Sequence, residues 1–241
     1  MMSINRQPYI DNIMNRFKAN VAVAKGSLEN EIYISTNKEN LEDICTYIHK
    51  TFQAPLSSII CNDERNLNKS FTIYYVFSLP DKDLFFIVYV LISEQSPNFP
   101  SITPYIPAAH WYEREIKDMF GLEPVGHPDP YTLVLHGNMP EDTYPLRKDF
   151  ATNTRLPHLE SKLPFARVDG EGVFEIPVGP IHAGIIEPGH FRFSAVGDTI
   201  LYLDAKLFFT HKGTEKLFEA MPYTKALFLA ERICGVCAAS H

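Results

Sequence analysis

The sequence has few cysteines, no long apolar run and no cluster of basic residues. Four cysteines among 241 residues are too few for the disulfide scaffold of a small secreted protein. The longest apolar run, Leu84 to Ile92, is well short of the roughly 18 residues of a membrane-spanning helix. A net charge of −7 without a basic stripe argues against binding of DNA or RNA. Met1 to Ile10 lacks a signal-peptide pattern, so we expect a protein without a transmembrane segment in a reducing, cytoplasmic setting.

What the sequence does contain is ample material for a packed core. Hydrophobic residues make up 45% of the chain and aromatic residues 12%, and 241 residues suffice for one large or two modest domains. Apolar residues from Ile10 to Phe17 recur at helical spacing, and Glu31 to Ser35 alternates as a strand. Thr36, with Glu39 three residues later, predicts the capped start of a second helix. Cys45 lies on the apolar face of that helix, which predicts a role in core packing.

Two strands rich in aromatic and β-branched residues follow. Phe71 to Leu79 and Phe85 to Ile92 are separated by the turn sequence Pro80 to Asp83, which predicts an antiparallel hairpin at the centre of a small sheet. The order of helix, strand, helix and hairpin predicts an α+β fold class.

A further helix is predicted to begin near His110, with an apolar face that includes Ile116. Glu113 and Lys117 are predicted to pair at i, i+4 on the opposite face. Gly121 is predicted to end the helix.

This helix carries the motif E-R-E-x-x-D-M-F-G, followed by G-H-P-D, which resembles the signature of the 30 kDa subunit of respiratory complex I. N-D-E-R-x-L-N and Y-P-L-R-K-D-F extend the resemblance over roughly residues 10–150, and we expect residues 1–150 to form this domain. In that family the domain clamps neighbouring subunits and contributes no catalytic residue. The resemblance therefore implies interface or fold-holding roles for the charged residues Glu113, Arg114, Glu115 and Asp118.

Residues 151–166 are polar and aperiodic, which predicts a linker to a second domain over residues 167–241. The second domain begins with strand patterns, including a hairpin around Gly197 and Asp198, and continues with helical patterns up to Ile233. Cys234 and Cys237 follow. At this spacing two thiols can form half of a zinc site, a redox dithiol or a disulfide. A second ligand pair for zinc is absent, and a helix-like stretch precedes the pair where a thioredoxin-type dithiol has a strand.

The flanking residues extend this pair to R-x-C-G-x-C-x-x-x-H, which resembles the first cysteine motif of [NiFe] hydrogenase large subunits. The resemblance implies that Cys234 is a terminal nickel ligand and that Cys237 bridges nickel and iron. His241 would donate a hydrogen bond near the bridging sulfur, and iron would also carry carbonyl and cyanide ligands. Those subunits complete the Ni–Fe centre with a second C-x-x-C farther along a longer chain.

Two upstream motifs, G-P-x-H and E-P-G-H-F-R, extend this resemblance. They imply that Glu187 is the carboxylate that passes protons to and from a nickel-bound thiolate. A glutamate suits that role because burial near a metal can move its pKa toward neutrality. His182 would orient groups or relay protons beside it. The alternative interpretation of Glu187 is a solvated loop carboxylate.

The chain thus places a 30 kDa-like domain ahead of the β-rich entry and first helices of a hydrogenase large subunit. Hydrogenase large subunits are themselves similar to the 49 kDa subunit of complex I. This order of domains resembles the large subunits of formate hydrogenlyase and hydrogenase-4. The resemblance implies an oxidoreductase that reversibly reduces protons to H2, with electrons from formate or another low-potential donor. It implies a small hydrogenase subunit with an iron–sulfur cluster and other complex I-like subunits as partners, peripheral on the cytoplasmic face of the inner membrane. Two alternatives remain open: a fused 30/49 kDa subunit of an NADH:quinone oxidoreductase, and a non-catalytic assembly or docking module.

Overall fold

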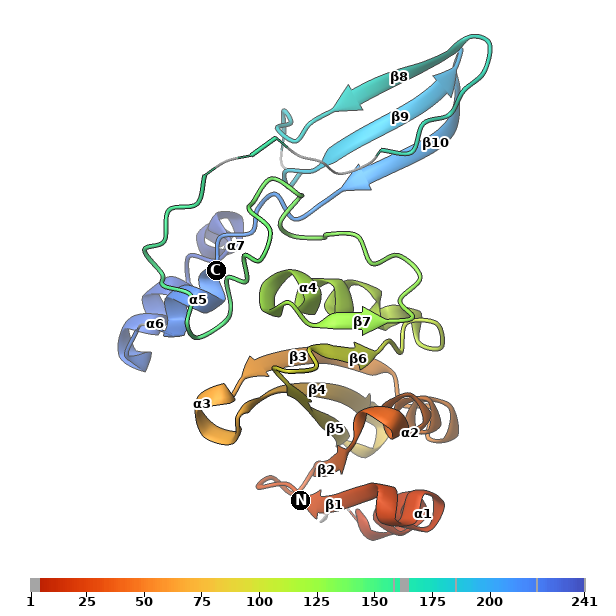
Figure 1. The fold of residues 1–241 in the computed structure, drawn as a ribbon, viewed down its shortest axis with the longest axis vertical. Coiled ribbons are helices and arrows are strands. Elements are labelled where there is room, and N and C mark those ends of the chain that lie inside the picture. Colours follow the sequence, from red (N-terminus) through yellow and green to blue (C-terminus); the bar gives the residue numbers. More distant parts are fainter. Residues whose placement is uncertain (1–4, 158, 161–164, 185, 220, 241) are drawn as a thin grey trace. The chain divides into compact units, whose positions relative to one another are not determined.

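The computed structural model describes residues 5–157, 159–160, 165–184, 186–219 and 221–240 (Figure 1). The chain divides into two compact units, Met1–Tyr131 and Thr132–His241. This structural division lies ahead of the predicted linker, residues 151–166.

Unit 1 has a mixed architecture of helices and sheet, as the sequence predicts. Its elements in chain order are α1 (Gln7–Phe17), β1 (Val21–Lys25), β2 (Glu31–Thr36), α2 (Lys38–Thr51), β3 (Leu56–Asp63), α3 (Arg65–Asn68), β4 (Ser70–Leu79), β5 (Leu84–Ser93), β6 (Asn98–Pro100), α4 (His110–Phe120) and β7 (Glu123–Val125).

The main sheet of unit 1 has the strand order β1-β2-β5-β4-β3. β4 and β5 form the predicted antiparallel hairpin, and β2 pairs with β5 in parallel. Alternate residues of β4, among them Phe71, Tyr75 and Phe77, are fully buried because the strand period of two places them on one face. Helix α2 packs on β4 and β5, and α4 packs on β3. Burial of each such aromatic side chain contributes about 2–3 kcal/mol of hydrophobic free energy.

Helix α2 begins one residue later than its predicted cap requires. The predicted capping role of Thr36 is wrong, because Thr36 is the last residue of β2. Asn37 caps the helix instead, and its side chain accepts a hydrogen bond from the backbone N–H of Asn40 at 3.2 Å. Cys45 is fully buried in the core, as predicted, and burial raises the pKa of its thiol.

Strands β1 and β3 occupy the two edges of the sheet, and the sequence patterns did not indicate them. In β3, Ser57 and Asn62 are exposed at the edge, so the strand lacks the apolar alternation that predicts strands. The end of α4 is as predicted: Gly121 adopts the left-handed conformation with φ of 70°.

Unit 2 contains a three-stranded sheet and three short helices. The elements are β8 (Val173–Val178), β9 (His190–Val196), β10 (Thr199–Lys206), α5 (Thr214–Glu219), α6 (Tyr223–Ala230) and α7 (Gly235–Ser240). The antiparallel order is β10-β9-β8, and β9 and β10 form the predicted hairpin. β8 includes Pro177 and continues to Val178, because proline is tolerated in an edge strand. Among the described residues, none of the helices has the length and apolar composition that crossing a bilayer requires.

Candidate functional site

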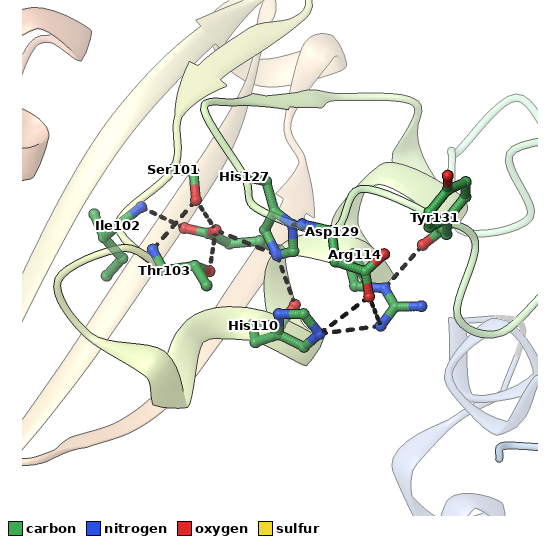
Figure 2. A network of polar contacts seen from close by, with 9 residues as sticks. Ser101, Ile102, Thr103, His110, Arg114, His127, Asp129 and Tyr131 are labelled. Carbon is green, nitrogen blue, oxygen red and sulfur yellow. Dashed lines mark hydrogen bonds and ion pairs between the residues drawn. The ribbon is translucent and has the colours of Figure 1, made fainter. Parts of the chain in front are cut away.

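A buried carboxylate in unit 1 is the centre of a polar network (Figure 2). The side chain of Glu113 in α4 is fully buried and accepts hydrogen bonds from the hydroxyls of Ser101 (2.5 Å) and Thr103 (2.6 Å) and from the N–H of Ile102 (2.7 Å). Burial raises the pKa of Glu113, and the hydroxyl donors oppose that rise. The predicted surface pair with Lys117 is therefore wrong. Glu113 precedes Ile116 by three residues and lies on the same buried face.

Lys117 lies on the exposed side of α4 and has a different partner. Its ammonium is 2.9 Å from Glu123 Oε2. Lys117 is thus solvated, whereas Glu113, its predicted partner at i, i+4, is buried inside unit 1.

His127 is packed beside this carboxylate in one defined tautomer. Its Nδ1 accepts the backbone N–H of Asp129 at 3.0 Å, so its Nε2 carries the proton and donates to the carbonyl of His110 at 3.1 Å. Glu113 Oε2 lies 4.0 Å from the same Nε2. Burial lowers the pKa of His127, which keeps the ring neutral.

Arg114 extends the network towards the surface. Its Nε donates to the carbonyl of Tyr131 at 2.8 Å, and its NH1 lies 3.3 Å from Asp129 Oδ2 and 3.1 Å from His110 Nε2 (Figure 2). Burial and the Arg114 charge lower the pKa of His110. The network joins the loop around Ser101 and the segment up to Tyr131 to α4. Glu113 itself is fully buried, and its hydrogen bonds hold the loop around Ser101 against α4.

The predicted thiol pair lies at the start of a helix in unit 2. Cys234 directly precedes α7, and its Sγ accepts the backbone N–H of Cys237 at 3.3 Å, the hydrogen bond of a helix N-cap. Cys234 is half-buried and Cys237 is exposed. A hydrogen bond from the Cys237 thiol lowers the pKa of Cys234, and the same interaction raises the pKa of Cys237. The pair therefore favours the thiolate on Cys234.

Glu187 lies close enough to the pair to affect both thiols, since its carboxylate raises the pKa of Cys234 and of Cys237. Of the contributions to the pKa of either thiol, this influence of Glu187 is the smallest. Its side chain is exposed, as in the alternative interpretation of a loop carboxylate.

His182 is held by the loop that it belongs to. Its Nε2 lies 2.7 Å from the carbonyl oxygen of Gly189, and His190 Nδ1 lies 3.2 Å from that of Gly179. Gly179 has a φ of +83°, and a Cβ there would lie 2.1 Å from the Gly189 oxygen and 2.6 Å from His182 Nε2. Only glycine fits this close approach. The loop therefore orients His182 towards its own backbone.

Two thiols are the donors that soft transition metals prefer, so they fit half of a four-ligand metal site. Within the part of the chain that the structure describes, no group of three or more histidine, cysteine, aspartate or glutamate side chains could hold a metal ion. His241 lies outside the described residues. The pair is thus compatible with a metal site to which further ligands contribute.

Comparisons with known proteins match both parts of the chain. The family described as "Respiratory-chain NADH dehydrogenase, 30 Kd subunit" matches residues 34–156, just over half of the chain. Hydrogenase-4 component G of Escherichia coli is 41% identical over 217 residues, which are 88% of this chain and 39% of that protein. Formate hydrogenlyase subunit 5 of Escherichia coli is 34% identical over 241 aligned residues, 98% of this chain and 42% of that protein.

The C/D subunit of an NADH-quinone oxidoreductase from Bacteroides thetaiotaomicron is 30% identical over 158 residues, which are 58% of this chain and 29% of that protein. The chain spans about two fifths of the length of the two Escherichia coli relatives.

Proposed function

This chain belongs to the family of the respiratory-chain NADH dehydrogenase 30 kDa subunit, and from that premise we propose that it is the complex I-like module of a hydrogenase. The complete enzyme would reversibly reduce protons to H2 with electrons from formate or another low-potential donor. The observation that carries the proposal is the extent of two alignments. The hydrogenase-4 and formate hydrogenlyase relatives align with 88% and 98% of the chain, and the NADH-quinone oxidoreductase relative with 58%.

In this proposal Cys234 and Cys237 supply two of the thiolate ligands of a Ni–Fe centre. Bound there, the centre would supply the redox chemistry of proton reduction, with carbonyl and cyanide ligands on iron. The hydrogen bond from the Cys237 N–H positions the Cys234 sulfur at the start of α7. Glu187 is the carboxylate that would accept and release protons beside the thiols, and its electrostatic effect on both supports that placement.

Two histidines complete the proposed site. His182, which is oriented by the Gly189 carbonyl, would position or relay a proton beside Glu187. His241 would donate a hydrogen bond near the sulfur of Cys237.

The proposed partners follow from the same family. They are a small hydrogenase subunit with an iron–sulfur cluster and other complex I-like subunits, with the assembly peripheral on the cytoplasmic face of the inner membrane. The words "component" and "subunit" in the names of the hydrogenase-4 and formate hydrogenlyase relatives agree with a multi-subunit assembly.

The test is metal analysis of the native complex that contains this chain, with a Cys234→Ala variant beside a Cys61→Ala control. Cys61 lies in β3 of unit 1, whereas the thiol pair belongs to unit 2. We expect stoichiometric nickel and H2 evolution from a reduced viologen in the wild type and in the control, and loss of both in Cys234→Ala.

A second candidate is a non-catalytic docking module, favoured by the match of residues 34–156 to the 30 kDa subunit family. A nickel-free wild-type complex that still assembles would contradict the hydrogenase proposal and establish this alternative.

A further inference from the structure

One face of the β8–β9–β10 sheet carries a cavity of about 360 Å³. The strand register places Arg192 directly opposite Pro177 of β8 and Asp204 of β10, and His190 directly opposite Lys206. Directly opposite residues share a face of an antiparallel sheet, and so do residues two positions apart on one strand. The register therefore gathers Arg192, His190 and Lys206 on the same face.

The ionisable side chains that line this cavity are two cations, Arg192 and Lys206, and two histidines. Among the described residues no carboxylate lines it. The counter-charges lie outside the lining: Arg192 NH2 is 3.1 Å from Glu175 Oε2, and Lys206 Nζ is 3.2 Å from Asp204 Oδ1. The cavity is thus lined by hydrogen-bond donors. The positive charges of Arg192 and Lys206 are neutralised by Glu175 and Asp204.

Glu175 and Asp204 do not accept a hydrogen bond from every N–H group of Arg192 and Lys206. Arg192 Nε is buried, and no hydrogen-bond acceptor among the described residues reaches it. A buried donor of this kind nearly always has a partner in native proteins. The ammonium of Lys206 has three N–H donors, of which Asp204 accepts one. An acceptor oxygen within the cavity can reach the remaining donors of the Lys206 ammonium, whereas Arg192 Nε stays enclosed by the protein.

The walls of the cavity are flat rings. The Arg192 guanidinium carbon lies 4.5 Å from the centroid of the Phe165 ring, and Lys206 Nζ lies 5.6 Å from it. His136 stacks on Phe209 with centroids 4.0 Å apart and planes at 12°. These rings favour a ligand that carries a flat unsaturated ring, because such a ring can stack on them.

We propose that this cavity binds a small organic monoanion, a carboxylate on a flat unsaturated ring, independently of the Cys234–Cys237 pair. The carboxylate accepts from the Lys206 ammonium beside the positive Arg192 guanidinium, and the ring lies against Phe165. Glu175 and Asp204 disfavour a second negative charge, so a carboxylate binds more tightly than a phosphate monoester of the same ring.

Calorimetric titration of the 241-residue chain with four probes tests each part of the proposal. The probe is 1-naphthoate, compared with 1-naphthalenemethanol (no charge), cyclohexanecarboxylate (no aromatic ring) and 1-naphthyl phosphate (a second charge). We expect 1-naphthoate to bind about tenfold more tightly than each of the others, which corresponds to roughly one lost charge-assisted hydrogen bond or stacking contact. Absence of 1-naphthoate binding, or equal binding of the neutral alcohol, would overturn the proposal. Tighter binding of the phosphate would overturn the monoanion preference.

Matched variants locate the binding. Arg192→Gln should weaken 1-naphthoate about tenfold or more. Arg167→Gln should not change its affinity, because Arg167 forms an exposed pair with Asp169 in which both side chains are at least 80% exposed. Equal effects of the two substitutions would place the ligand elsewhere and sink the proposal.

Two further variants keep the test decisive if Arg192→Gln fails to fold. Arg192→Lys keeps the charge and removes the planar guanidinium over Phe165, and Phe165→Leu removes the aromatic wall. Both should weaken 1-naphthoate, whereas Phe174→Leu, which alters a half-exposed ring of β8 outside the lining, should not. Unchanged affinity in Arg192→Lys and Phe165→Leu would contradict the proposed contacts.

Discussion

Unit 1 and unit 2 differ in where their apolar side chains lie. In unit 1 the large residues of β4 and β5 are buried against α2 and α4, and even the carboxylate of Glu113 is fully enclosed. In the described part of unit 2 the buried hydrophobic residues are Leu133, Val134 and Ala195.

The strand β10 illustrates the contrast. Its consecutive residues Leu201, Tyr202 and Leu203 are 49%, 43% and 47% exposed, although neighbouring side chains alternate between the two faces of a strand. Unit 1 thus buries its large apolar side chains in its own core, whereas large apolar side chains of the unit 2 sheet remain exposed.

The largest expected effect comes from removing a core ring in unit 1. Phe77→Ala deletes a fully buried side chain of β4 and should lower the free energy of unfolding of unit 1 by about 3–5 kcal/mol. The matched change in unit 2, Phe174→Ala, removes a side chain that is 45% exposed and should cost less than about 1 kcal/mol. Trp111, the only tryptophan, reports unit 1 by fluorescence during urea unfolding, and hydrogen exchange reports unit 2. Comparable losses would refute the contrast between the units.

The next effect concerns Glu113. Glu113→Ala leaves the donors of Ser101, Ile102 and Thr103 buried without their acceptor and should destabilise unit 1 by about 3 kcal/mol. Urea unfolding followed by Trp111 fluorescence measures this loss. The exposed Glu29→Ala serves as the control, with an expected change within about 0.5 kcal/mol. An equally small loss in Glu113→Ala would show that the network does not hold the fold.

A smaller effect is expected in the loop of unit 2. Gly179→Ala places a Cβ 2.1 Å from the Gly189 oxygen at a φ of +83°, and should destabilise the loop by about 2–3 kcal/mol. Gly172→Ala has a similar φ of +74° with open space around it, and should cost about 1 kcal/mol. Hydrogen exchange of the Gly189 N–H, which donates to the Pro180 carbonyl, measures the difference. Equal protection in both variants would mean that the close approach is not required.

The smallest effect is a pH dependence confined to unit 1. The pKa values of His110 and His127 are lowered in the folded state, mainly by burial, so their contribution to stability is present above the ordinary histidine pKa and is lost as the pH falls through the folded values. Stability of unit 1 should therefore fall as the pH drops below the ordinary histidine pKa of about 6.5, by at most about 1.4 kcal/mol per pH unit for each histidine. The raised pKa of Glu113 has the opposite sign, because its contribution is lost as the pH rises.

A Glu113→Gln variant separates the pH dependence of the histidines from the opposite pH dependence of Glu113. In Glu113→Gln the carboxyl no longer titrates, so adding His127→Gln should flatten the remaining slope of unfolding free energy against pH. A slope that His127→Gln leaves unchanged would assign the pH dependence to other groups.

Much of unit 1 could be predicted from local pattern. The β4–β5 hairpin, α1 and the glycine end of α4 follow from periodicity and turn chemistry that act over a few residues. The errors arose where tertiary structure overrides that pattern. Glu113 looked like a surface charge, although its spacing from Ile116 places it on the buried face, and the hydroxyls that satisfy it come from the loop around Ser101.

The candidate sites show the same limit. The C-x-x-C pair is visible as a motif, but the electrostatic influence of Glu187 on its thiols depends on how the loop before β9 folds. Arg192 and Lys206 share a face of the β9–β10 hairpin because the register shifts between Ile200 and Tyr202, and Phe165 joins them from outside the strands. Single-sequence patterns do not specify such a register, so the cavity could not be predicted.

The parallel pairing of β2 with β5 has a consequence for how unit 1 folds. The pairs β1–β2, β3–β4 and β4–β5 join strands that are neighbours in sequence. In contrast, Glu31–Thr36 of β2 pairs with Phe85–Val90 of β5, which is synthesised much later. The β1–β2 pair and the β3–β4–β5 strands can thus form early. The slow step is the pairing of β2 with β5, because it closes a large loop. During synthesis, the open edges of β2 and β5 stay unsatisfied until the ribosome has released β5, which makes this interval the one most exposed to mispairing between chains.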